Sequence, residues 1–171
     1  MSAPARLTAG WLRSGRPATH DEHRGCYGPL PHRARPGALA QAIAEAGLTG
    51  RGGAGFPTGT KLRAVAGRRG PAVVVANGME SEPASQKDQA LLSRVPHLVL
   101  DGAVLAAEDV RAEVVHVCLP RTRPALVDLV REAVADRDRS GAGSVPIEVH
   151  ELPHHYVSSE ETSLVRWLNG G

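Results

Sequence analysis

Cysteine is scarce in this chain of 171 residues, which contains only Cys26 and Cys118. No CxxC pair is present, and this argues against a disulfide framework and against a cluster or zinc ion held by thiolates. Aromatic residues make up only 3% of the chain, so few rings can stack on single-stranded nucleic acid. Lysine is limited to Lys61 and Lys87, and the formal charge of 20 − 18 = +2 is too small to indicate a nucleic-acid partner.

Long apolar runs are also missing. None approaches the roughly 20 residues that a membrane-spanning helix requires, and no secretory signal segment is evident. We therefore predict a cytoplasmic protein, or one at the cytoplasmic face of a membrane complex. The length suits one domain with a single core. Residues 1–36 carry Pro, Gly, His and Arg without periodicity, and we expect an irregular arm there, followed by a domain at 37–171.

Hydrophobic periodicity in the rest of the chain predicts alternating helices and strands. The expected helices cover 38–46, 57 or 58 to about 66, 98–107, 125–134 and 159–168. The expected strands cover 72–76, 113–118 and 147–150. This alternation predicts an α/β fold, with a Rossmann-like, mostly parallel sheet, flanking helices and a glycine-rich loop before the first strand. In such sheets ligands bind beyond the carboxyl ends of the strands, where 77–86 and 153–159 are expected to lie.

Glycine, in contrast, is concentrated in one place. The fifteen residues Gly47-Leu-Thr-Gly-Arg-Gly-Gly-Ala-Gly-Phe-Pro-Thr-Gly-Thr-Lys61 include six glycines, together with Arg51 and Lys61. Glycine lacks the Cβ that keeps a backbone away from a ligand, and it accepts positive φ at no steric cost. Successive backbone N–H groups can then turn inward around an anion. This composition predicts a loop that binds a phosphate group or a flat nucleotide cofactor.

Two common nucleotide-binding loops do not fit this segment. Gly50-Arg-Gly-Gly-Ala-Gly55 matches GxGxxG, but that fingerprint requires a strand before it and a helix starting within it. Here a predicted helix precedes the glycines, and Phe56-Pro57 follows them. A GxxxxGK[ST] loop is excluded because Lys61 stands one position too late and Leu62 follows it. A glycine-rich surface loop without a ligand remains the alternative.

Further motifs follow the glycine loop in a fixed order. They are Asn77-Gly-Met-Glu-Ser-Glu-Pro83, Lys87-Asp88, Pro96-His-Leu98 and Tyr156-Val-Ser-Ser-Glu-Glu-Thr162. With the loop, this series resembles the NADH-binding flavoprotein (51-kilodalton) subunit of respiratory complex I and its relatives in NAD-linked hydrogenases and formate dehydrogenases. The resemblance covers about residues 37–171. It implies FMN and NAD(H) as cofactors, and other subunits of a redox complex as partners. The family's 4Fe–4S cluster belongs to a later region with no counterpart in these residues.

The resemblance also implies a set of site residues. The glycine loop would wrap FMN and the incoming NADH through Gly50, Arg51, Gly52, Gly53, Gly55, Phe56 and Lys61. Asn77, Glu80 and Ser81 would line the flavin pocket. Glu82 would lie near the ribose hydroxyls of NADH, where a carboxylate accepts from a 2′-OH and repels a 2′-phosphate. A closing segment would contain Tyr156, Glu160, Glu161 and Thr162. No side chain is expected to be the catalytic group, because FMN would accept the hydride.

Each of these motifs taken alone has a simpler interpretation. Glu80 and Glu82 suit a solvated turn, while Glu160 and Glu161 suit the first turn of a helix, where acidic side chains are favourable. The pair His154-His155 has no third ligand at zinc spacing, and we predict no metal site.

Several positions depart from the family pattern. Met79 stands where the family has aspartate, Ala84 and Ser159 replace glycines, and an aromatic residue expected after Lys61 is missing. The sequence thus predicts the FMN- and NAD(H)-binding portion of an NADH dehydrogenase, with hydride transfer from NADH to FMN. The alternative is a degenerate or truncated nucleotide-binding or assembly module without catalysis.

Overall fold

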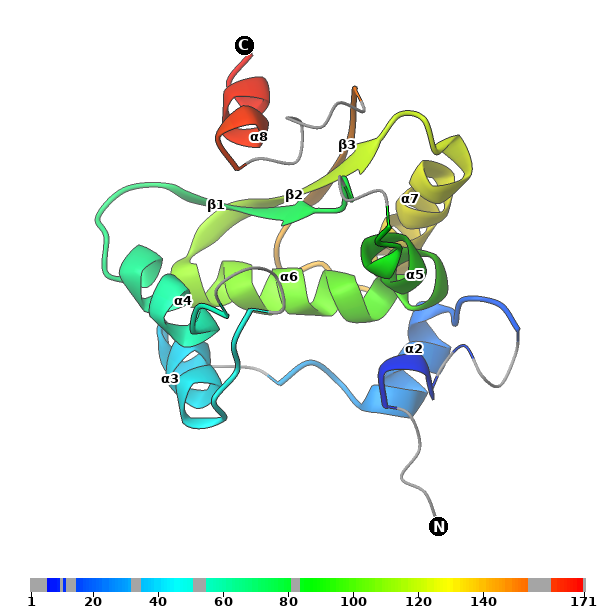
Figure 1. Cartoon of the computed structure of the whole chain (residues 1–171). Helices are drawn as coiled ribbons and strands as arrows, with labels where there is room; N and C mark the ends of the chain where they lie inside the picture. The colour runs from blue at the N-terminus through cyan, green and yellow to red at the C-terminus, as the bar shows by residue number, and fades with distance from the viewer. Residues whose placement is uncertain are drawn as a thin grey trace.

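A three-stranded parallel sheet with helices between its strands forms the framework of the chain (Figure 1). The computed structural model describes residues 6–9, 11, 15–31, 35–50, 55–80, 84–153 and 161–170. Its elements are η1 (Arg6–Thr8), α2 (His20–Tyr27), α3 (Ala38–Glu45), α4 (Thr58–Ala66), β1 (Ala72–Asn77), α5 (Lys87–Arg94), α6 (Pro96–Val110), β2 (Ala112–Pro120), α7 (Pro124–Arg139), β3 (Ile147–Leu152) and α8 (Glu161–Leu168). The predicted α/β fold with a parallel sheet is confirmed.

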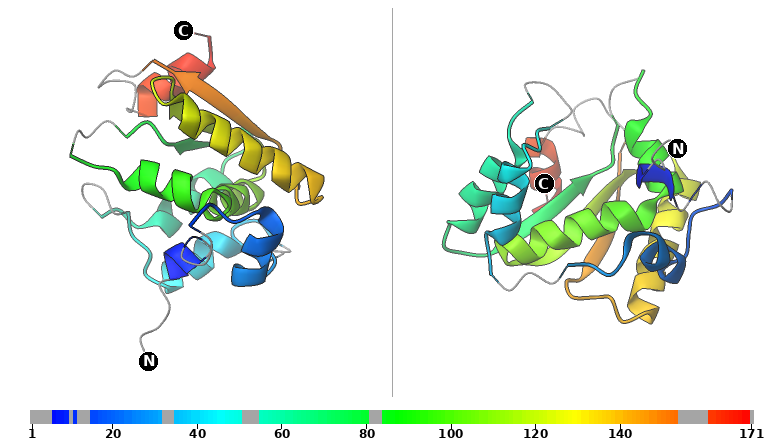
Figure 2. Two further views of the ribbon diagram at one scale, coloured as in Figure 1. Left: turned by 90° about the vertical axis from the view of Figure 1, so that its right-hand side faces the viewer. Right: turned by 90° about the horizontal axis from the view of Figure 1, so that it is seen from below.

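The strands lie in the order β1-β2-β3, so β2 is central. Cys118 pairs with Asn77 on one side, and Pro120 pairs with Leu152 on the other. The carboxyl ends of all three strands therefore meet at one edge of the sheet. Crossovers between parallel strands almost always have the same hand, so two successive crossovers in this strand order place their helices on the same face. Figure 2 shows α6 and α7 on one face of the sheet and α8 on the other.

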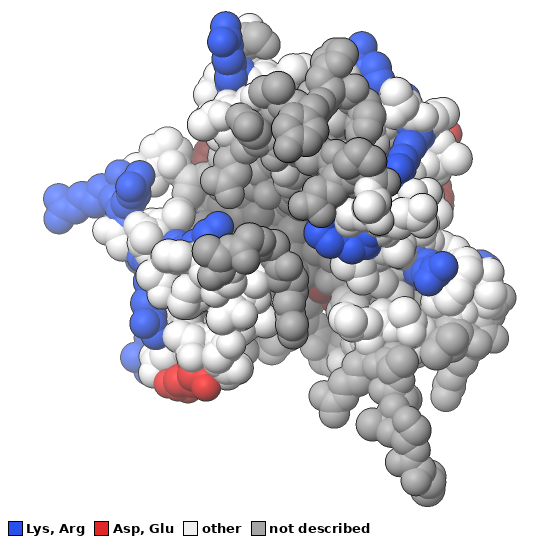
Figure 3. All heavy atoms as spheres, in the orientation of Figure 1, with Lys and Arg blue, Asp and Glu red and all other residues white. Residues whose placement is uncertain are grey.

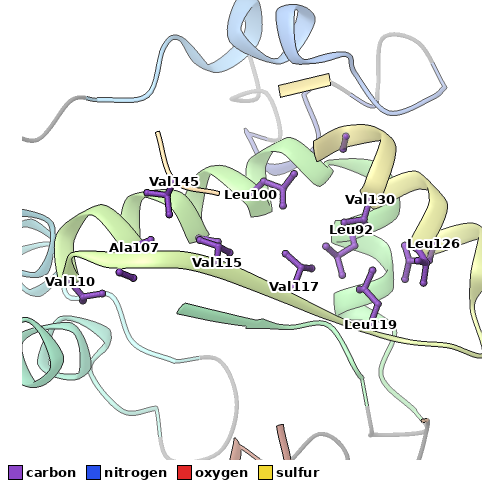
Figure 4. Close-up of a cluster of buried hydrophobic side chains, with 14 residues drawn as sticks. Leu92, Leu100, Ala107, Val110, Val115, Val117, Leu119, Leu126, Val130 and Val145 are labelled. Carbon is purple, nitrogen blue, oxygen red and sulfur yellow. The ribbon is translucent and has the colours of Figure 1, made fainter. Parts of the chain in front are cut away.

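The main core fills the space between the sheet and the α5–α7 layer (Figure 4). Side chains alternate along β2, so Val115, Val117 and Leu119 all point into this core and are at most 1% exposed. Leu100 of α6 and Val130 of α7 close it from the helical side and are fully buried. The helices predicted at 98–107 and 125–134 are therefore present as α6 and α7, and both extend beyond the expected ends.

A smaller apolar cluster covers the opposite face of the sheet. It contains Met79, Cys118, Leu152 and Leu164, each buried, with Trp167 of α8 packed against them. Burial raises the pKa of the Cys118 thiol to about 11, so this thiol stays protonated and packs as a small apolar group.

Helix α2 corrects the expectation that residues 1–36 are irregular throughout. Thr19 and Glu22 form a capping box, in which the Thr19 side chain accepts from the Glu22 backbone and the Glu22 carboxylate accepts from the Thr19 backbone. The Thr-x-x-Glu spacing was the available signal for this helix start.

Helix α5 was also not predicted. No single helix of the described residues meets the length and hydropathy of a membrane span, although α5 and α6, bent by 101°, do so as a pair.

A buried polar network attaches α2 to α6 and α7. His23 donates from Nε2 to Asp101 at 2.7 Å, and the same carboxylate accepts from Arg137. The side chain of His97 is 4% exposed, and its Nδ1 atom has no hydrogen-bond partner among the described residues. Burial is the largest cause that lowers the pKa of His97 to about 4, followed by the positive charges of His23, His20 and Arg137, while Asp136 opposes them.

Helices α3 and α4 flank the glycine-rich loop and contact each other through Gly59. A Cβ at Gly59 would lie 2.7 Å from the carbonyl oxygen of Ala40 and 2.9 Å from the Cβ of Ala44. These distances are too short for real contacts, so α4 approaches α3 this closely only because residue 59 has no side chain. Packing between helices therefore explains this glycine without a ligand.

Gly59→Ala is expected to lower the free energy of unfolding by about 1–2 kcal/mol, because overpacking costs about 1–3 kcal/mol and exceeds the roughly 1 kcal/mol gain in helix propensity. Gly102→Ala is the matched control, since Gly102 is exposed in α6 and a Cβ there meets no atom within 4 Å. That control should gain about 0.5–1 kcal/mol. Urea denaturation measures both, and equal effects of the two substitutions would contradict the close approach at Gly59.

The His97 network predicts a loss of stability in mildly acidic solution. A histidine whose folded-state pKa is depressed contributes stability above its ordinary pKa of 6.5, and this is lost as the pH falls toward about 4. The shift corresponds to about 3 kcal/mol, and His20, whose pKa burial also lowers, adds to it. The free energy of unfolding, measured by denaturation between pH 7 and 4.5, should depend less steeply on pH in His97→Gln than in the parent chain. An unchanged slope would contradict the assignment.

Candidate functional site

The glycine-rich loop is closed at its base by backbone pairing. Gly50 donates its N–H to the carbonyl of Phe56 at 3.0 Å, and Thr58 donates to Leu48 at 3.0 Å. Gly55 has φ of 60°, a left-handed conformation that favours glycine. The two ends of the loop are therefore held side by side at its base. The predicted ligand residues Arg51, Gly52 and Gly53 come between these two ends in the sequence and lie outside the described residues.

Phe56 and Lys61 come together at the start of α4. The Lys61 ammonium lies 5.9 Å from the centre of the Phe56 ring, a cation–π distance. The Phe56 side chain is 49% exposed, so the structure holds a large aromatic ring at the surface beside a positive charge. Exposed aromatic rings next to a cation suit stacking with a flat, anionic ligand. The structure thus brings together two of the residues that the sequence selected.

Two hydrogen bonds hold the turn at the carboxyl end of β1. Asn77 accepts from the Met79 backbone N–H at 3.1 Å, which turns the chain directly after the strand. Gly78 donates to Cys118 at 2.9 Å, and a Cβ on it would lie 2.8 Å from both Leu92 and Leu119. Met79, at the position of the family aspartate, is 1% exposed and belongs to the apolar cluster under α8. Its side chain therefore contributes packing where the family has a carboxylate.

Glu80 has a structural role at the start of α5. Its carboxylate accepts from the hydroxyl of Ser85 at 2.7 Å and from the backbone N–H groups of Asp88 at 3.2 Å and Gln89 at 3.0 Å. Burial acts to raise the pKa of Glu80, but these hydrogen bonds and the nearby Lys87 outweigh it, so the pKa lies below its ordinary value. Glu80 also has φ of 40°, which is unusual for a residue with a side chain.

The remaining predicted residues are described in part or not at all. Ser81, Glu82, Tyr156 and Glu160 lie outside the described residues. Glu161 begins α8, and Thr162 is exposed in the first turn of that helix. Contacts of all these residues with a cofactor therefore stay predictions.

Two arginines that follow β2 at the same edge were not among the residues selected from the sequence. Arg121 is exposed and donates its backbone N–H to Leu152 at 2.9 Å, while the Arg123 guanidinium donates to the side chain of Gln89. The rule that ligands bind beyond the carboxyl ends of parallel strands was the signal that could have found them. They add positive charge at the edge of the sheet where the neighbouring strand β1 ends at Asn77.

A small cleft lies against the carboxyl half of β1. It has a volume of about 180 Å³ and is lined by Ala76, Asn77, Gly78, Asp88, Leu91, Leu92, Val99 and Val117. Ligand pockets generally enclose about 300–1,000 Å³, so these residues alone do not enclose a nucleotide. A larger cleft, of about 330 Å³, lies by α2 and Ser140, away from the motifs that suggest chemistry. Figure 3 shows Lys and Arg side chains spread over several parts of the face seen in Figure 1.

Comparison with known proteins gives a consistent assignment. The family model described as "Nuo51 FMN-binding domain" matches residues 43–171. A subunit of the NADH-quinone oxidoreductase of Aquifex aeolicus is 31% identical over 144 residues, which cover 79% of this chain and 34% of that protein. The equivalent NADH-quinone oxidoreductase subunit of Streptomyces coelicolor is 37% identical over 146 residues, covering 79% of this chain and 32% of that protein. The chain thus spans about a third of these relatives.

Solved structures agree with the sequence matches. The air-oxidized crystal structure of an NAD+-reducing [NiFe]-hydrogenase aligns with a TM-score of 0.70 and 36% identity, over 78% of this chain and 23% of that one. The H2-reduced state aligns with a TM-score of 0.68 and 33% identity, over 81% of this chain and 25% of that one. The family match extends from α3 through the glycine loop to the end of α8, as the ordered motifs predicted. The chain belongs to the family of the Nuo51 FMN-binding domain.

Proposed function

We propose that this chain is the FMN- and NAD(H)-binding portion of an NADH dehydrogenase-type oxidoreductase. The observation that carries the proposal is the family match over residues 43–171, which includes every motif selected for the cofactor site. FMN, when bound, supplies the hydride acceptor. The chain's own residues would bind and orient the two nucleotides. Relatives described as subunits of NADH-quinone oxidoreductase support a place among other subunits of a redox complex at the cytoplasmic face of a membrane.

The described residues fit an anionic flavin nucleotide in their backbone and charge. The loop base held by Gly50 and Phe56, with Gly55 in a left-handed conformation, permits close backbone approach. Lys61 would neutralise phosphate or hydrogen-bond the flavin, and the exposed Phe56 ring would stack on the nicotinamide nucleotide. Asn77 would line the flavin pocket from the end of β1.

A non-catalytic assembly module is the second candidate, and two observations favour it. Met79 is buried among apolar side chains where the family has an aspartate, so an acceptor near the flavin is lost. The carboxylate of Glu80 is already held by the backbone of α5 and by Ser85. Both residues strengthen packing at the carboxyl end of β1, where the proposed function needs polar contacts to a ligand.

Flavin retention distinguishes the two functions. The purified chain mixed with FMN should keep the visible flavin bands through gel filtration, and NADH should bleach them under anaerobic conditions. The Glu82 carboxylate expected near the ribose predicts slower bleaching by NADPH.

Lys61→Ala should weaken FMN binding about 10- to 100-fold, since hydrogen bonds to charged groups contribute about 1.5–3 kcal/mol. Arg63→Ala, an exposed cation on the same helix, is the matched control.

Failure to retain FMN at saturating concentration, with the fold intact by circular dichroism, would overturn the oxidoreductase proposal for this chain and favour the assembly module. Equal losses of FMN affinity in the Lys61 and Arg63 variants would instead remove Lys61 from the site and indicate a diffuse electrostatic effect.

The role of Glu80 in α5 predicts a change in stability. Glu80→Gln keeps the shape but removes the charge that strengthens three hydrogen bonds, and the free energy of unfolding should fall by about 1–2 kcal/mol. Because the folded-state pKa of Glu80 is depressed, this difference should be present at pH 7 and disappear as the pH falls below the ordinary value for glutamate. Glu113→Gln, at an exposed position of β2, is the control for denaturant melts. Unchanged stability with altered FMN affinity would contradict the structural role.

A further inference from the structure

Three side chains with metal-binding atoms converge on one face of the sheet. His116 belongs to β2, and Glu148 and His150 belong to β3. The Nδ1 atom of His116 lies 2.9 Å from Nε2 of His150 and 3.3 Å from a carboxylate oxygen of Glu148. The same carboxylate oxygen lies 3.5 Å from Nε2 of His150. The three donor atoms thus form a compact triangle.

The register of the two strands explains this convergence. His116 pairs directly with Glu148, and His150 stands two residues further along β3, on the same face. Ile147 and Val149 pack against the main core, so the residues that alternate with them project from the other face of the sheet. That face carries α8, whose Trp167 meets the ring of His150 edge-on, with 5.5 Å between ring centres. Strand pairing therefore holds the three side chains together before any ligand binds.

Two of the three donor spacings match a tetrahedral zinc site, and the third, 2.9 Å between the imidazole nitrogens, is shorter. Zinc binds nitrogen and oxygen at about 2.0–2.2 Å, which in a tetrahedral site separates neighbouring donor atoms by roughly 3.3–3.5 Å. The circle through the three donor atoms has a radius of about 1.9 Å, so a point about 2.1 Å from all three exists roughly 0.9 Å outside their plane. In a regular tetrahedron the ion lies about 0.7 Å outside that plane. Small side-chain rotations accommodate the difference.

A hydrogen bond between the two imidazoles accounts for only part of this arrangement. In a neutral pair, one ring donates its N–H and the facing nitrogen of the other ring accepts with its lone pair. The Glu148 oxygen lies within 3.5 Å of both facing nitrogens, so it also faces that lone pair. A cation among the three atoms would be attracted by all of them. The side chains of His116 and His150 are 15% and 22% exposed and that of Glu148 is 58% exposed, so solvent reaches the cluster.

We propose that His116, Glu148 and His150 form a site for a divalent transition metal, with zinc as the preferred ion and water at the fourth position. Two imidazoles and one carboxylate are ligands that zinc favours, and three protein ligands leave one position for solvent. The ion would join β2 to β3 beside α8. The proposal does not depend on flavin binding.

The test uses the untagged full chain with Cys26→Ser, which removes the exposed thiol as a competing ligand. Titration with Zn2+ against a chromogenic chelator should show one tight equivalent per chain. Co2+ should give the visible absorption of a four-coordinate site. In a Trp11→Phe background Trp167 is the sole tryptophan, and Cu2+ should quench its emission stoichiometrically, because Trp167 contacts His150.

Two glutamates on β3 provide a matched pair of variants. Glu148→Gln should weaken Zn2+ binding markedly. His116→Gln or His150→Gln should weaken it by more than about 100-fold, because metal affinity falls 10- to 100-fold even when the lost group only hydrogen-bonds to a metal ligand. Glu151→Gln should leave Zn2+ affinity unchanged, because Glu151 is paired with Arg131 of α7 at 2.7 Å. Circular dichroism without metal separates loss of the site from loss of the fold, and the exposed Glu148 keeps the test usable if a histidine variant unfolds.

Absence of a tight Zn2+ equivalent in the folded parent chain would overturn the proposal and leave a hydrogen-bonded histidine pair. Tight binding that survives both Glu148→Gln and His116→Gln would also overturn it, since another part of the chain would then hold the ion. The proposal would also be overturned if Cu2+ quenched Trp167 equally in the parent and His150→Gln chains.

Discussion

The pairing of β2 with a parallel strand on each side is the constraint on which the rest of the structure depends. Its register with β1 and β3 sends Val115, Val117 and Leu119 into the main core and His116 and Cys118 to the other face. A shift of one residue would exchange these two faces, burying an imidazole among aliphatic side chains. The same pairing aligns the carboxyl ends of the strands, so the turn after β1 and the arginines after β2 share an edge.

The sequence was most informative where structure is decided locally. A continuous apolar run identified β1, alternation of apolar and polar residues identified β3, and helical spacing of Leu126, Val127 and Val130 identified α7. Burial imposes a period that the chain must match. Helix α2 is polar and short, and its burial depends on His20 and His23 reaching α6 and α7, contacts that periodicity does not reveal. Helix α5 likewise depends on Glu80, which bonds to its first backbone N–H groups from outside the helix.

The candidate site likewise has features that the sequence predicts and features that only the fold reveals. The glycine loop stands out in the sequence because its composition is itself the signal, and the structure adds the paired base and the contact between Phe56 and Lys61. The use of Glu80 in α5 could not be predicted, since a carboxylate in a turn serves a helix or a ligand equally well. The cluster of His116, Glu148 and His150 was invisible to spacing rules, because its members come from two strands and meet only through sheet register.

Met79 connects the proposed cofactor edge to the second apolar cluster. Its side chain packs with Cys118, Leu152 and Leu164, so α8 is stabilised partly by a residue of the turn that would border the flavin. Full burial of an apolar side chain such as that of Met79 favours the fold by about 1.5–3 kcal/mol. This packing couples the position of α8 to the turn after β1. Any movement of this turn would also have to repack the cluster beneath α8, so the rigidity of this edge and the position of the helix are set by the same residues.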